Sequence, residues 1–205
     1  MAEPRISLTP ERFCEEYLKA LHILGQQNGS LESYKGRESW TVRSEEIAKE
    51  VIYSVYINQK DVHPMWMVQK EYYKIDFIGY LTNWDNPNNT EKQHDWELKI
   101  AYEHENEKDK WHDELCKLCH IVADLRVLVS YHDFEKGSVR DILQQKINRL
   151  GIWKLHRVPN SNWLFLFGPS QHYEYPFKAF TLNSDLRVIE LECCKNIEVI
   201  PGNWK

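Results

Sequence analysis

Long apolar runs and an excess of basic charge are both missing from this 205-residue chain. No apolar stretch approaches the ~20 residues that a membrane-spanning helix needs. The opening residues, MAEPRISLTPERF, have neither a basic start nor an apolar segment, so an exported protein is not expected and we predict a cytoplasmic location. The formal net charge of −5 gives no general attraction for nucleic acid, which would have to bind through a local cluster of Lys and Arg.

Cysteine is present at no more than ordinary density. The chain has five, an odd number that is typical of reduced thiols rather than of a secreted disulfide scaffold. The stretch CKLCH, Cys116 to His120, has the spacing of covalent haem attachment, and His112 nearby also suggests zinc. Haem attachment of that kind needs an exported chain, and both cysteines lie beside the apolar Leu115 and Leu118. We therefore predict that they pack in the core.

Aromatic residues are plentiful, with 8 Trp, 11 Tyr and 7 Phe, enough for one sizeable core. No internal repeat or linker divides the sequence, so we predict a single domain over residues 1–205. Its parts are N-terminal helices over 9–58, a central core over about 44–134 and a C-terminal extension over 135–205.

Apolar periodicity predicts an α/β fold with a mixed central sheet flanked by helices. The expected helices span about 9–26, 44–58, 108–123 and 138–150, and the expected strands span about 65–81, 94–106, 125–134, 163–168, 177–182 and 186–191. The first two strands should form a long β-hairpin, and the second and third should be parallel neighbours joined by a right-handed crossover. Trp163, Phe165 and Phe167 alternate on their strand, as in a core or at the surface of a homodimer.

Three carboxylates are expected to converge on this hairpin. Glu103 and Glu105 in IAYEHEN project from one face of a strand, about 7 Å apart, and repel unless a cation lies between them. A hairpin loop centred near residues 88–90 would set Asp76 opposite residues 101–104. Such a group suits Mg²⁺ or Mn²⁺, which can lower the pKa of a bound water and neutralise charge on a phosphoryl oxygen.

An Asp on one strand, an apolar run ending in Glu-x-Glu on the next, a helix and a further apolar strand together resemble the PD-(D/E)XK nuclease superfamily. The resemblance covers roughly 44–134 and implies a restriction-endonuclease-like core of α-β-β-α-β order, to which the C-terminal helix and strands are additions. It implies Asp76 and Glu103 as metal ligands, with Glu105 standing where Lys is usual and Ile75 where Pro is usual. The implied activity is metal-dependent hydrolysis of phosphodiester bonds in nucleic acid. DNA is expected as the partner in preference to RNA.

Other assignments of the site stay open. Glu97-Leu98-Lys99 is a literal E-x-K on the same strand, but by the hairpin arithmetic it lies further from Asp76. We prefer Glu103 and Glu105 and keep Lys99 as the candidate for the missing cation. We expect His104 to point to the opposite face from Glu103 and to pack or hydrogen-bond within the core rather than bind the metal. Polar residues on the neighbouring helices are further candidates: Glu50, Lys110, Glu114 and Lys117.

A second class of function is also open. IAYEHEN can be a solvated strand end whose charges are balanced by nearby Lys. In that case the protein would be a catalytically inactive binding or oligomerisation protein on the same fold, and its carboxylates would form only an acidic patch.

Overall fold

The computed structural model describes residues 9–27, 46–52, 65–72, 74–82, 96–107, 110–150, 162–169 and 177–194. Its helices are α1 (Pro10–Gln27), a helical segment at 46–52, α3 (Trp111–Leu118) and α4 (Val139–Leu150), with the short 3₁₀ turns η4 (Phe134–Lys136) and η5 (Glu192–Cys194). Its strands are β1 (Met65–Tyr72), β2 (Ile75–Thr82), β3 (Trp96–His104), β4 (Leu125–His132), β5 (Asn162–Pro169), β6 (Lys178–Leu182) and β7 (Val188–Leu191). None of the helices in these ranges is both long and apolar enough to cross a membrane.

The seven strands form one mixed sheet in chain order, β1 to β7. Pairs β3–β4 and β4–β5 are parallel, and the remaining neighbours are antiparallel. All eight residues of β4 are buried, as expected for a central parallel strand covered on both faces. The predicted α/β class and the parallel pairing of β3 with β4 are confirmed.

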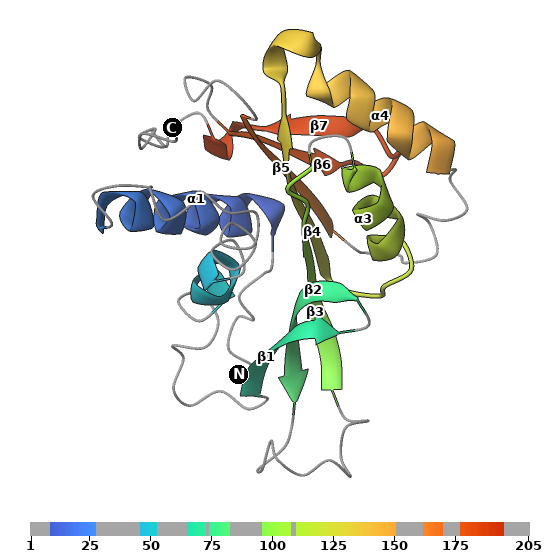
Figure 1. Ribbon diagram of the computed structural model, residues 1–205. Coiled ribbons are helices and arrows are strands. Elements are labelled where there is room, and N and C mark those ends of the chain that lie inside the picture. The colour runs from blue at the N-terminus through green and yellow to red at the C-terminus, as the bar shows by residue number, and fades with distance from the viewer. Residues whose placement is uncertain are drawn as a thin grey trace.

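Helices cover both faces of this sheet (Figure 1). Helix α1 and segment 46–52 pack on one face, against inward side chains such as Tyr102 and Val127. Helices α3 and α4 pack on the other, against side chains such as Ala101 and Leu128. Because neighbouring residues of a strand point to opposite faces, the strands alternate between two separate apolar cores.

Several predicted boundaries are wrong. Residues 65–81 are not one arm of a hairpin, because β1 ends at Tyr72 and β2 begins at Ile75, and the two pair antiparallel. Lys74 makes the turn at a φ of 64°, a conformation usually signalled by Gly or Asn, and neither is present. The helix predicted over 108–123 ends at Leu118, and Val122 beyond it is 69% exposed. Of the helix predicted over 44–58, only 46–52 lies within the described residues.

The alternating aromatic residues of β5 belong to the core. Trp163, Phe165 and Phe167 are buried on the face that α3 and α4 cover. Trp163 stacks on Phe165 with ring centroids 5.5 Å apart, and the buried guanidinium of Arg126 lies 4.9 Å from the Trp163 ring. Burial of all three favours the core interpretation over a dimer surface.

Candidate functional site

Asp76 and Glu103 come together across the β2–β3 pair, as the sequence predicts. Phe77 faces Tyr102 in the antiparallel register, and continuing that register by one residue sets Asp76 opposite Glu103. The backbone N–H of His104 donates to Oδ2 of Asp76 at 2.8 Å, which holds this carboxylate against the end of β3. Opposing residues on one face have Cβ atoms about 5 Å apart, so the two carboxyl groups are close enough to influence each other strongly.

Glu103 is fully buried on the face covered by α3, with an exposed fraction of 0%. Burial, and next the Asp76 carboxylate, raise the pKa of Glu103 from 4.5 to about 10, against the opposing effect of Lys117. Burial also raises the pKa of Asp76, although the His104 hydrogen bond counteracts it. At neutral pH the pair therefore keeps a proton on Glu103, which reduces the repulsion between the two groups.

The cation beside these carboxyl groups is Lys117, from the helix that follows β3. Helix α3 buries Trp111, Leu115 and Leu118, and this packing turns Glu114 and Lys117 toward Glu103. The Lys117 Nζ lies 2.9 Å from Oε1 of Glu103 and also forms an ion pair with Glu114. Burial by itself lowers the pKa of Lys117, but the contacts with Glu114 and Glu103 outweigh it and raise that pKa.

Glu105 lies beyond the end of β3 and its carboxylate has a different contact. Its backbone N–H donates to the carbonyl of Val129 at 2.9 Å and its own carbonyl accepts from Oγ of Ser130 at 3.1 Å. Its Oε1 accepts the backbone N–H of Glu107 at 2.6 Å. Glu114, rather than Glu105, therefore joins Glu103 in contact with the Lys117 ammonium.

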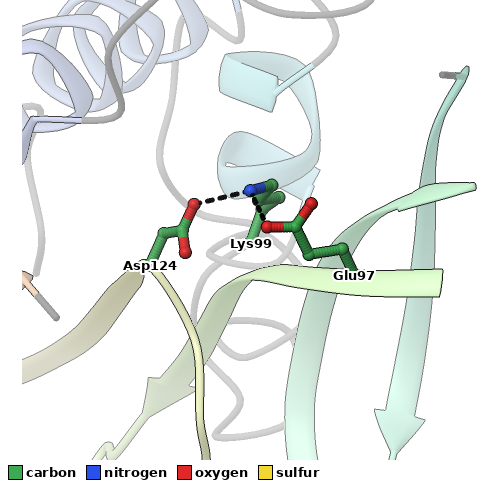
Figure 2. A network of polar contacts seen from close by, with 3 residues as sticks. All are labelled: Glu97, Lys99 and Asp124. Carbon is green, nitrogen blue, oxygen red and sulfur yellow. Dashed lines mark hydrogen bonds and ion pairs between the residues drawn. The ribbon is translucent and has the colours of Figure 1, made fainter. Parts of the chain in front are cut away.

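Lys99 is placed elsewhere on β3. Its Nζ binds Oδ2 of Asp124 at 2.8 Å and forms an ion pair with Glu97, as Figure 2 shows. Glu97 faces Leu81 on β2, five residues along that strand from Asp76. Four residues of strand separate Lys99 from Glu103, or about 13 Å. The structure does not bring the E-x-K residues together with Asp76.

The remaining candidates lie outside the Asp76–Glu103 pair. Glu50 is exposed on segment 46–52, which covers the opposite face of the sheet from Glu103. Lys110 pairs with Glu107 at 2.6 Å. His104 is buried, its Nε2 lies 3.1 Å from the hydroxyl of Tyr131, and burial lowers its pKa to about 3. The prediction that His104 packs and hydrogen-bonds in the core is confirmed.

The CKLCH motif is part of α3 and the turn after it. Cys119 is buried and Cys116 is half-buried with Sγ 3.9 Å from Nε2 of His112. The core assignment is confirmed for Cys119, which packs with Leu115 and Leu118.

The donor atoms around Lys117 are of the kind that a divalent cation accepts, because hard cations prefer oxygen ligands. Asp76, Glu103 and Glu114 supply carboxylates, and the Lys74 carbonyl accepts from the Lys117 Nζ at 3.0 Å. Within the described ranges, the Glu103 oxygens accept no N–H or O–H hydrogen bond beyond the contact with the Lys117 ammonium. As they stand, no three His, Cys, Asp or Glu side chains of those ranges are arranged to hold a metal, so a cation would require Lys117 to move and the carboxylates to close in.

The sequence-based prediction preferred Glu105 and Lys99 and named Glu114 and Lys117 only as further candidates. A local signal exists, since residues three apart on a helix share a face and both directly precede buried leucines. Nothing in the sequence pattern indicated that the Lys74 carbonyl would contact Lys117. No protein-family model and no curated protein matches this chain.

Proposed function

We propose that this protein is a divalent-metal-dependent nuclease with a restriction-endonuclease-like core, which hydrolyses phosphodiester bonds of nucleic acid. The observation that carries the proposal is the Asp76–Glu103 pair on adjoining strands, with the ammonium of Lys117 on the next helix 2.9 Å from Glu103. Two acidic groups beside one cation, on a strand–helix–strand unit, are the parts that phosphodiester hydrolysis needs. The proposal includes a cytoplasmic location and DNA as a more suitable partner than RNA.

Each residue has a distinct role in this proposal. A bound Mg²⁺ or Mn²⁺ would lower the pKa of a water and neutralise charge on the phosphoryl oxygens. Asp76, Glu103 and Glu114 would hold the cation, and Glu103 would give up its proton on binding it. Lys117 replaces Lys99 as the group that stabilises negative charge developing on the phosphate. The hydrogen bond from His104 to Asp76 orients that carboxylate.

Cleavage assays on single- and double-stranded DNA and RNA test the proposal. Wild-type protein should cut at least one of these substrates with Mg²⁺ or Mn²⁺ and lose the activity when a chelator is added. Asp76→Asn and Glu103→Gln should abolish cutting, since each removes a metal ligand without changing side-chain size. Glu97→Gln is the matched control, because it removes a carboxylate from the other end of β3 and should keep activity. Cutting that survives in both Asp76→Asn and Glu103→Gln would contradict the assignment.

A second candidate is a catalytically inactive binding protein on the same fold. It is favoured by the complete burial of Glu103, because a carboxyl group closed under a helix does not reach a phosphate unless side chains move. In that case the wild-type protein should cut none of the substrates, and Mn²⁺ should leave its thermal stability unchanged.

A further inference from the structure

The Lys117 ammonium is surrounded by oxygen atoms from three parts of the fold. It contacts Oε1 of Glu103 on β3 at 2.9 Å and Oε2 of Glu114 on its own helix. It also donates to the Lys74 carbonyl, in the turn between β1 and β2, at 3.0 Å. Two carboxylates and a backbone carbonyl are also ligands that Mg²⁺ or Mn²⁺ would accept.

Lys117 also lies between this oxygen cluster and solvent. Its side chain is 34% exposed, whereas that of Glu114 is 17% exposed and that of Glu103 is 0% exposed. A cation arriving from solvent therefore meets Lys117 before it meets Glu103. The side chain of Lys is long and flexible, so its ammonium can move outward while the helix stays in place.

We propose that Lys117 is a displaceable occupant of the cation site. In the metal-free protein its ammonium fills the position between Glu103 and Glu114 that a divalent cation would take, and cation binding expels it toward solvent. This inference rests on the proposed function, and it links two parts of that function: the cation that binds the carboxylates also frees the ammonium to meet a substrate phosphate.

Isothermal titration with Mn²⁺ alone tests the competition. Lys117→Met keeps the length and apolar stem of the side chain but removes the ammonium, so its Kd for Mn²⁺ should be at least tenfold tighter than that of wild type. Lys110→Met removes a 62%-exposed lysine beside the same helix and should stay within twofold of wild type. An equal or weaker affinity in Lys117→Met would overturn the proposal.

A second measurement uses the wild-type protein, so it does not depend on the folding of a variant. Amine acetylation, followed residue by residue by mass spectrometry, should be slow at Lys117 without metal and several-fold faster with saturating Mn²⁺. The rate at Lys110 should not change. A Lys117 rate that stays constant or falls while Mn²⁺ is bound would overturn the displacement.

The two proposals fail in different ways. Tighter Mn²⁺ binding by Lys117→Met without cleavage of any nucleic acid would support the displacement of Lys117 and contradict the nuclease proposal. Metal-dependent cleavage with no effect of Lys117→Met on Mn²⁺ affinity would support the nuclease proposal and contradict the displacement. Absence of Mn²⁺ binding in both wild type and Lys117→Met would overturn both.

Discussion

Glu103 is a carboxyl group that the fold holds in its protonated form. It is the only fully buried carboxyl group among the described residues. Two further carboxylates lie near it, Asp76 on β2 and Glu114 on α3. An isolated charge in such a place would cost several kcal/mol. The proton on Glu103 and the ammonium of Lys117 together remove most of that cost in the absence of metal.

The stability of the metal-free protein should therefore fall as the pH rises. The pKa of Glu103 is about 10 in the folded protein, against 4.5 as the ordinary value. Between these values the folded state holds a proton that the unfolded state has lost, so the free energy of unfolding decreases by up to about 1.4 kcal/mol per pH unit. The contribution is fully present below about pH 4.5 and is lost as the pH approaches 10. Glu103→Gln cannot ionise and should be more stable than wild type at pH 8, by up to about 5 kcal/mol for the 3.5 pH units above 4.5.

Urea denaturation at pH 5, 7 and 9 in chelator-treated buffer would measure this difference. Asp113→Asn serves as the control, since Asp113 is an exposed carboxylate on α3, the helix that covers Glu103. Parallel pH profiles for wild type and Glu103→Gln would show that Glu103 is already ionised in the folded protein.

Strand β7 is the last strand of the sheet, and α4 protects its outer edge. The backbone N–H of Val188 donates to Oε1 of Gln144 at 2.8 Å, and the Val188 carbonyl accepts from Nε of Arg140 at 3.3 Å. The Gln144 Nε2 also donates to the Leu186 carbonyl at 3.1 Å. Side chains of α4 thus satisfy both backbone groups of Val188, which this edge strand would otherwise offer to another chain.

Removing one of these side chains should lower the free energy of unfolding. Gln144→Ala leaves the N–H of the buried Val188 without its acceptor, so we expect a loss of about 1–2 kcal/mol in the free energy of unfolding. Gln145→Ala changes the adjacent exposed residue and should cost less than about 0.5 kcal/mol. Chemical denaturation of the two variants side by side gives the comparison, and equal losses would mean that the contacts of Gln144 add nothing.

Gly168 controls the packing between β5 and the start of β6. A Cβ at this position would lie 2.8 Å from ring atoms of Phe177 and 3.0 Å from the ring of Tyr131. Both rings are buried, so neither can move away freely. Gly168→Ala should destabilise the protein by about 1–3 kcal/mol through overpacking. Gly168→Ala combined with Phe177→Leu should recover part of the loss in thermal unfolding, and no recovery would point to a backbone effect instead.

At the scale of the whole molecule, the sheet separates two helical layers, and the candidate site belongs to only one of them (Figure 1). Asp76 and Glu103 come from the sheet, and Glu114 and Lys117 come from α3. A ligand that binds these groups therefore links α3 to β2 and β3. Such a ligand stabilises the folded state by mass action, because the site does not exist in the unfolded chain.

Metal binding should consequently appear in the global unfolding transition. At a Mn²⁺ concentration of 100 times the Kd, the wild-type protein should gain about 2.7 kcal/mol, seen as a rise in Tm. Asp76→Asn should show little or no rise, because it lacks a ligand, and Glu97→Gln should respond like wild type. An equal rise in Asp76→Asn and wild type would place the bound metal somewhere else.

Much of the strand and helix order follows from the sequence alone. Runs of apolar residues identify β3, β4 and β5, and a period of 3.6 residues identifies α4, since these patterns are local. The meeting of Asp76 with Glu103 was also predictable, because an antiparallel register follows from the position of the loop. The turn at Lys74 was not, since its positive φ is adopted by a residue with no preference for it.

Only the tertiary structure decided which cation and which third carboxylate accompany Asp76 and Glu103. Lys99 and Glu105 lie near them in sequence, but Lys99 is held by Glu97 and Asp124, and the Glu105 carboxylate binds the backbone beyond the strand. Lys117 and Glu114 reach the site because burial of one face of α3 sets how that helix lies on the sheet. The register of a β-hairpin is set by the loop that joins its two strands, whereas the docking of a crossover helix depends on side chains from the whole core.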